Sequence, residues 1–177
     1  AEVRHEKKEN RMPAIRAGKL ATATRSVVLT RRGMVCSASP LAAAAGIEML
    51  HEGGNVIDAA VATAAAECVT IPMMCGVGGE VFVLYYEASS GKLFGLTGSG
   101  AAPTGATPEF FLSKGYKSMP LEGPLSATIP GETHAWHTLL ERFGTLGLSR
   151  LLQPAIRLAE DGFPIPERIS AYYPMNY

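Results

Sequence analysis

Two helical segments made almost entirely of small side chains dominate the first half of the sequence. The first is predicted to run from Ser39, a suitable N-cap, to His51. The second is predicted from Asn55, another N-capping residue, to Cys68, and nearly every side chain at 59–66 is Ala, Val or Thr. A helix this thin lets neighbouring backbones approach closely. We therefore expect the second helix to lie buried against a sheet.

A glycine-rich turn and a pair of strands follow these helices. Residues 76–79 (GVGG) precede the β-branched and aromatic run VFVLYYE at 81–87, which predicts a strand. A second strand at 92–97 is joined to it by a Ser-Ser-Gly turn, which predicts an antiparallel hairpin with the alanine-rich helices on one face. Two further short strands are predicted at 25–30 and 34–38.

The second half of the sequence predicts mainly helices. The expected elements are a helix at 108–112 capped by Thr107, a short strand at 125–129, a helix at 132–143 with Trp136 on its apolar face, a helix that Ser149 caps and Gly162 ends, and a further helix beginning near 167.

Several of these motifs, in this order, resemble the γ-glutamyltranspeptidase family, a branch of the N-terminal-nucleophile hydrolases. They are the GMV…SPLA…G-x-E-M-L…GGN-x-x-DAAVA run, the GVGG-x-x-F turn, TIPGETHAWHTLLERFGTLGL and LLQPAIRLAEDGFPI. The resemblance covers about 25–170. It implies an α+β, four-layer αββα fold to which residues 25–177 contribute the N-terminal part of the large subunit, after a flexible basic lead-in at 1–24.

The resemblance also implies a chemistry that is divided between two chains. Enzymes of this family cut themselves into a large and a small chain, and a threonine at the new N-terminus of the small chain is the nucleophile. The family's Thr-Thr-His context is absent here, because Thr133-His134 follows Glu132 inside a predicted helix. We therefore assign no catalytic residue to this chain. The expected partners are the small catalytic subunit, the rest of the large subunit and a small-molecule amide substrate, with no cofactor or metal.

The loop after the hairpin is where the resemblance predicts substrate binding. Transpeptidases of the family hold the substrate carboxylate with an arginine that aligns with Ser99, and residues 98–102 contain no cation. We assign Ser99, Gly100 and Ala101 to substrate binding, and this loop looks more like the acylase and oxamate-amidohydrolase members. The predicted activity is amide hydrolysis or acyl transfer. A γ-glutamyl enzyme acting on glutathione-like substrates, a non-catalytic scaffold, and a plain turn role for Ser99 stay open.

Composition and the remaining polar residues exclude several other classes of function. The 16 basic and 16 acidic side chains balance, which argues against nucleic acid as a partner, although residues 1–32 are locally basic. Cys36, Cys68 and Cys75 lack metal-ligand spacing and are expected to be buried reduced thiols. Asp58 is interpreted as a helix-dipole partner or a buried hydrogen-bond acceptor, and His134 and His137 as residues outside any metal site.

Two predictions concern the cell and the assembly. The sequence contains no continuous apolar run of about 18 residues, so no membrane span is predicted. No signal-peptide pattern is visible, which favours a cytoplasmic location and leaves periplasmic or secreted locations open. A higher oligomer also stays open.

Overall fold

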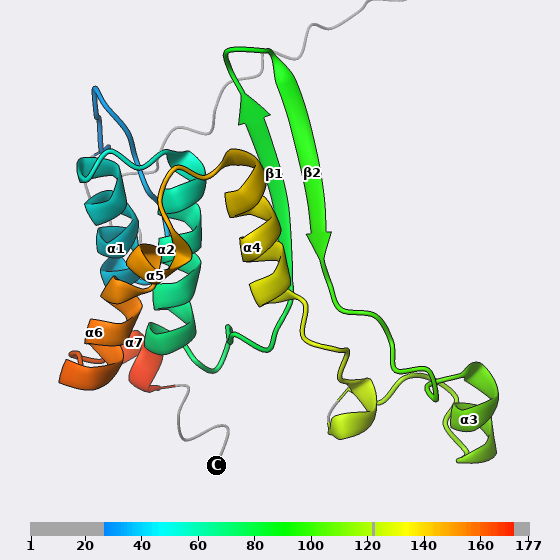
Figure 1. Ribbon diagram of the computed structural model, residues 1–177. Coiled ribbons are helices and arrows are strands. Elements are labelled where there is room, and N and C mark those ends of the chain that lie inside the picture. Colours follow the sequence, from blue (N-terminus) through cyan, green and yellow to red (C-terminus); the bar gives the residue numbers. More distant parts are fainter. Residues whose placement is uncertain (1–26, 122, 172–177) are drawn as a thin grey trace, which may run out of the picture. The chain divides into compact units, whose positions relative to one another are not determined.

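A computed structural model describes residues 27–121 and 123–171 of the chain, in two compact units that divide after residue 32. The lead-in predicted at 1–24 lies outside the described residues, and residues 27–32 form neither helix nor strand. The second unit contains all the assigned elements (Figure 1): α1 (Pro40–His51), α2 (Val56–Thr70), β1 (Val81–Glu87), β2 (Lys92–Gly98), α3 (Pro108–Ser113), the 3₁₀ turn η1 (Pro124–Ser126), α4 (Glu132–Phe143), α5 (Leu148–Leu151), α6 (Gln153–Asp161) and α7 (Glu167–Ser170).

The predicted capping residues begin three of these helices. The Ser39 hydroxyl accepts a hydrogen bond from the Ala42 N–H, and the Thr107 hydroxyl accepts one from the Phe110 N–H. Asn55 caps α2 in a full capping box, in which the Asp58 carboxylate accepts the Asn55 N–H at 2.8 Å. The three predicted caps are confirmed. Sequence alone was sufficient to predict them because each cap depends on residues only two or three positions apart.

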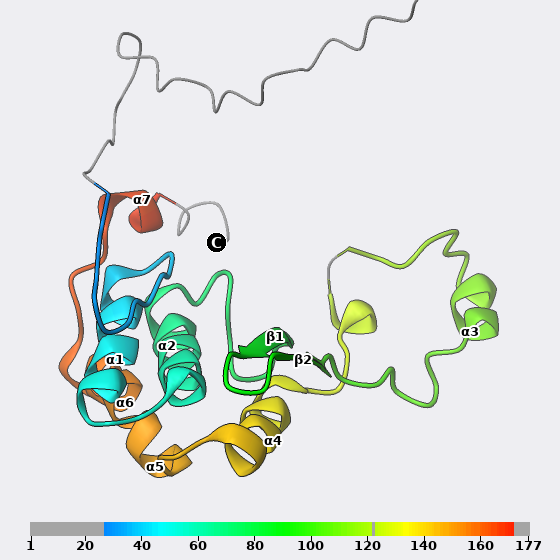
Figure 2. The same ribbon diagram turned by 90° about the horizontal axis from the view of Figure 1, so that it is seen from above.

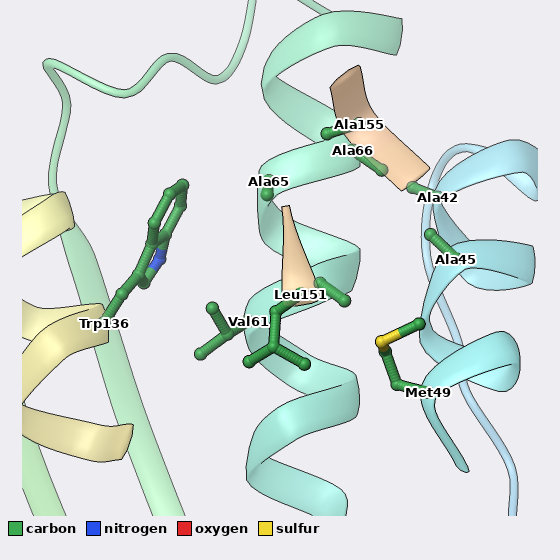
Figure 3. Packing of buried hydrophobic residues seen from close by; sticks show 10 residues of the cluster. Ala42, Ala45, Met49, Val61, Ala65, Ala66, Trp136, Leu151 and Ala155 are labelled. Carbon is green, nitrogen blue, oxygen red and sulfur yellow. The ribbon is translucent and has the colours of Figure 1, made fainter. Parts of the chain in front are cut away.

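The small side chains of α1 and α2 allow the two helices to pack at close range. A Cβ on Gly46 of α1 would lie 3.0 Å from the Ala59 carbonyl oxygen of α2 and would overlap the Thr63 hydroxyl. Figure 3 shows α2 between α1 on one side and the Trp136 side chain of α4 on the other. Met49, Ala62 and the predicted core residue Trp136 are all at most 2% exposed. The face of α2 that carries Ala62 is therefore buried, but mainly among helices and not against a sheet as predicted.

The helix that covers the hairpin is α4, and the prediction that the alanine-rich helices cover it is wrong. β1 and β2 pair antiparallel, with Tyr85 opposite Phe94. Phe143 at the end of α4 packs on both rings, with centroids 5.0 Å from Tyr85 and 4.9 Å from Phe94. Aromatic pairs prefer tilted or edge-to-face arrangements at such centroid distances, so Phe143 stabilises the contact between α4 and the hairpin. Helix α2 instead lies beside α1, as Figure 2 shows, and the two helices pack against each other.

The opposite face of the hairpin is apolar and exposed. Because side chains alternate along a strand, Phe82, Leu84 and Tyr86 of β1 share this face with Leu93 of β2. Phe82 is 68% exposed and Leu84 is 79% exposed. An apolar surface of this kind marks a contact face.

The short strands predicted at 34–38 and 125–129 are absent, and of the one predicted at 25–30 the described residues 27–30 form no strand. A strand needs a hydrogen-bonded neighbour, and within the described residues β1 and β2 pair only with each other. At 34–38 the Ser37 hydroxyl instead donates to Glu67 and accepts the Ser39 N–H, which bends the chain into α1. At 125–129 Gly123, with φ of 87°, leads into η1.

The helix predicted after Ser149 is divided into two. α5 begins at Leu148 after Gly147, so Ser149 lies inside a helix and does not cap one. Leu152 separates α5 from α6, where Pro154 has no N–H to donate to the preceding turn. Arg157 of α6 then ties this helix to α1, with Nη2 2.7 Å from Glu48 Oε2.

Candidate functional site

The three predicted substrate-binding residues, Ser99, Gly100 and Ala101, lie in the loop that directly follows β2. Ser99 and Ala101 are exposed, and Gly100 between them is half-buried. The loop at 98–102 presents a hydroxyl, backbone groups and no charged side chain. Such a surface offers hydrogen bonds to a neutral group but no fixed positive charge for a carboxylate.

The backbone of this loop lies against the segment at 128–132, which leads into α4. The Ile129 N–H donates to the Ala101 carbonyl oxygen at 3.0 Å. The Gly131 and Glu132 N–H groups both donate to the Gly79 carbonyl oxygen, at 3.2 and 3.1 Å. The end of β2, the turn before β1 and the start of α4 are therefore joined by backbone hydrogen bonds.

A hollow of about 430 Å³ borders the same loop at Ala102. Its lining is mostly apolar, with Phe111 of α3 and Tyr116 among the larger side chains, and Lys117 adds a positive charge. The hollow thus combines space for an apolar group with a nearby cation, on the side of the loop that leads to α3.

A buried carboxylate lies at the start of α4. Glu132 is 6% exposed, and burial raises the pKa of its carboxyl group, with the Glu67 carboxylate adding to the rise. Burial also raises the pKa of the Cys68 thiol to about 12, with a further contribution from Glu132. A thiol that stays protonated is a poor nucleophile, so Cys68 is unsuited to covalent catalysis.

The three cysteines are free thiols, but the prediction that all are buried is wrong. Cys36 is exposed, and Cys68 and Cys75 are half-buried. Cys36 falls in the extended chain before α1, where the predicted strand does not form and no sheet covers it.

Asp58 is a buried hydrogen-bond acceptor, as predicted, whereas the expectation that His134 and His137 hold no metal stays a prediction. Asp58 accepts hydrogen bonds from the N–H groups of Asn55, Thr145 and Leu146. His137 Nε2 lies 3.1 Å from Glu141 Oε1 on the exposed side of α4. Across residues 27–121 and 123–171, no three His, Cys, Asp or Glu side chains gather as metal ligands.

Comparison with known proteins places this chain in a family. The γ-glutamyltranspeptidase family model matches residues 42–177. The chain belongs to the γ-glutamyltranspeptidase family. It is 38% identical over 156 residues to a glutathione hydrolase proenzyme of Bacillus subtilis (strain 168), covering 84% of this chain and 27% of that protein. It is also 38% identical over 149 residues to the acylase ACY 1 proenzyme of Pseudomonas sp. (strain SE83), covering 78% of this chain and 26% of that one.

Solved structures of the family show the same fold. The γ-glutamyltranspeptidase of Helicobacter pylori matches with a TM-score of 0.76 and 36% identity, over 82% of this chain and 42% of that one. A cephalosporin acylase from Bacillus halodurans matches with a TM-score of 0.83 and 40% identity, over 94% of this chain and 31% of that one. The predicted N-terminal-nucleophile hydrolase fold, to which this chain contributes a part, is confirmed. The chain spans about a quarter of the length of the curated relatives it matches.

Sequence reasoning missed the contact between the loop and the segment at 128–132. The signal available was the presence of Gly98 and Gly100 in the loop after the hairpin and of Gly131 in the TIPGETHAW motif, because repeated glycines accompany close backbone approach. The sequence did not reveal which glycines meet. As for membranes, no helix in the described part of the chain is both long enough and apolar enough to span one.

Proposed function

We propose that this chain is the N-terminal part of the large chain of an amide-bond hydrolase, able in principle to transfer acyl groups. Its nucleophile is a threonine at the N-terminus of a separate small chain. The threonine hydroxyl attacks the amide carbon, the C–N bond breaks and the amine leaves with a proton; water then hydrolyses the acyl-enzyme ester, which releases the acid and restores the hydroxyl. The observation that carries this proposal is family membership at 38% identity to proteins named as proenzymes. The name proenzyme accords with a precursor that is cut before it is active.

The exposed face of the hairpin supports a partner from the same precursor. Phe82, Leu84, Tyr86 and Leu93 present a continuous apolar surface on the side of the sheet that α4 does not cover. In the αββα fold a second sheet packs on this side, with the two inner faces forming a shared core. The rest of the large chain and the small chain supply that layer.

The uncharged loop at 98–102 favours an amide substrate without an amino-acid carboxylate. An arginine paired with a carboxylate contributes about 1.5–3 kcal/mol, which corresponds to roughly tenfold to a hundredfold in binding. Ser99 cannot make that contact. We therefore place the substrate among amides whose acyl group carries no amino-acid carboxylate, and we propose that Ser99, Gly100 and Ala101 contact that acyl group.

A second candidate is a γ-glutamyl hydrolase or transferase acting on glutathione-like substrates. Lys117 favours it, because this cation lines the hollow that borders the loop at Ala102. The relatives named glutathione hydrolase point the same way. A lysine is a point charge rather than a planar fork, so it would bind the carboxylate with less directional selectivity.

The experiment compares kcat/KM for a γ-glutamyl anilide and for an amide without the amino-acid head group, in the complete matured enzyme. Wild type is expected to prefer the neutral amide. Ser99→Arg is expected to shift the ratio of the two kcat/KM values toward the γ-glutamyl substrate by about tenfold or more. Thr104→Arg, an exposed position in the same connection, is the matched control and leaves the ratio unchanged.

Two results would overturn parts of this proposal. A wild-type preference for γ-glutamyl substrates that is lost in Lys117→Met supports the second candidate. A complete protein that matures without a Thr, Ser or Cys at the N-terminus of the co-purifying chain is not an enzyme of this type. The kcat/KM ratio tests the first result, and mass spectrometry of the co-purifying chain tests the second. A protein without the nucleophile is then a binding scaffold.

A further inference from the structure

Three stretches of backbone meet at the end of β2, at positions where any side chain would be obstructed. A Cβ on Gly98 would lie 2.5 Å from the Ala135 Cβ and 2.8 Å from Val81 Cγ1. A Cβ on Gly131 would lie 2.8 Å from the Gly100 nitrogen and would overlap the Gly98 carbonyl oxygen. Real Cβ contacts at these distances are repulsive, so the absence of side chains allows this junction to form.

The tightest contact in the junction joins Gly100 to Ile129. A Cβ on Gly100 would overlap the Ile129 carbonyl group and would lie 3.1 Å from the Ile129 nitrogen. One residue further on, the Ile129 N–H donates to the Ala101 carbonyl oxygen at 3.0 Å. The two backbones therefore lie in direct contact at the centre of the predicted substrate loop.

The segment at 128–132 is itself held at both of its ends. The Thr128 hydroxyl donates to Glu80 Oε1 at 2.9 Å, beside the turn that precedes β1. At the other end the Gly131 and Glu132 N–H groups share the Gly79 carbonyl oxygen. The segment is therefore hydrogen-bonded both to the turn at 79–80 and, through Ile129, to the loop at 98–102.

We infer that the segment at 128–132 positions the substrate loop, with Gly100 and Gly131 as positioning residues that determine where Ser99 and Ala101 meet the substrate. This inference rests on the proposed function. The physical reason is the size of the side chains in the loop. A long side chain compensates for a displaced backbone by changing rotamer, whereas Ser99 and Ala101 have almost no such freedom. The location of their backbone therefore decides the contact.

The test is Gly100→Ala in the complete matured enzyme, with Gly105→Ala as the matched control. Gly105 also lies in the loop between β2 and α3, and a Cβ at this position would have no neighbouring atom within 4 Å. Gly100→Ala must push the loop away from Ile129. We expect KM for the amide substrate to rise about tenfold to a hundredfold while kcat changes less than about threefold. Hydrogen exchange should show lost amide protection confined to peptides around 98–102 and 127–132. Gly105→Ala should change neither readout.

Thr128→Val keeps the inference testable where Gly100→Ala does not mature. It removes the hydrogen bond to Glu80 without adding bulk, and Thr104→Val is its exposed control. We expect KM to rise about fivefold in Thr128→Val, the effect of one lost hydrogen bond, and to stay unchanged in the control.

The variant Ser99→Arg separates failure of this inference from failure of the proposed site. In one outcome Ser99→Arg alters the kinetics, but Gly100→Ala and Thr128→Val do not. This outcome would place the loop in the substrate site and would overturn only the positioning role of the segment at 128–132. Unchanged kinetics in all three variants would place the loop outside the substrate site. That result would overturn both the positioning role and the proposed substrate contacts of Ser99, Gly100 and Ala101.

Discussion

The Thr145 N–H donates to both carboxylate oxygens of Asp58, at 3.1 and 3.2 Å, although the two residues are 87 positions apart. The Thr145 hydroxyl and the Leu146 N–H donate to the same carboxylate. One buried side chain thus completes the capping box of α2 and also holds the turn between α4 and α5. These hydrogen bonds join α2 to the turn after α4. They therefore link the packed helices α1 and α2 to α4 and the strand β2 that it contacts, in addition to the apolar core.

Asp58→Asn is expected to destabilise the complete protein by about 1–3 kcal/mol, because the amide nitrogen cannot accept the N–H groups that point at this carboxylate. The measurement is the midpoint of chemical denaturation. Asp161→Asn, at the exposed end of α6, is the control and should leave the midpoint unchanged. Equal midpoints for wild type and Asp58→Asn would show that these hydrogen bonds contribute nothing net.

The stabilisation from Asp58 should also depend on pH. Burial opposes ionisation of this carboxyl group, but hydrogen bonds from Thr145, Asn55 and Leu146 outweigh burial and lower its pKa below the ordinary 3.8. The folded state therefore binds the proton less readily than the unfolded state. The stabilisation is present in full above pH 3.8 and is lost as pH falls through the lower, folded-state pKa. The difference in stability between wild type and Asp58→Asn should shrink over that acid range, and a difference independent of pH would contradict this.

Ala62→Leu is expected to destabilise the protein by about 1–3 kcal/mol, because Ala62 is fully buried in the close packing of α2 and a larger side chain must displace its neighbours. Ala60→Leu is the control, since Ala60 is exposed on the same helix. Denaturation midpoints check both variants. An equal effect in the two would show that the cost comes from the helix itself and not from its packed face.

Residues 1–177 expressed alone should bind a dye that reports exposed apolar surface, because one face of the hairpin is uncovered. The double variant Phe82→Thr/Leu84→Thr replaces both apolar side chains by a polar, β-branched residue that suits a strand, and it should bind less dye. Leu121→Thr removes an exposed but isolated leucine, 98% exposed, and should change little. A cooperative melt of the wild-type chain without dye binding would contradict the proposal that another part of the precursor covers this face.

The sequence by itself determined the helix starts at Ser39, Asn55 and Thr107 and the hairpin at 81–98. Each of these depends on hydrogen bonds or alternation within a few residues, so local pattern is sufficient to specify it. The family motifs also predicted the N-terminal-nucleophile hydrolase fold, because several of them occur in the family's order along the chain.

Only the tertiary structure decided which surfaces meet. Among residues 27–121 and 123–171 the expected strand at 34–38 has no neighbouring strand, and α4 covers the sheet in place of α2. Gly100 meets Ile129, which lies 29 residues further along the chain, beyond the reach of any local pattern. The same holds for Asp58 and Thr145. A carboxylate in a first helical turn predicts a dipole partner, but its second set of donors arrives from 87 residues away. Such contacts depend on the packing of whole elements, and packing is a property of the assembled chain.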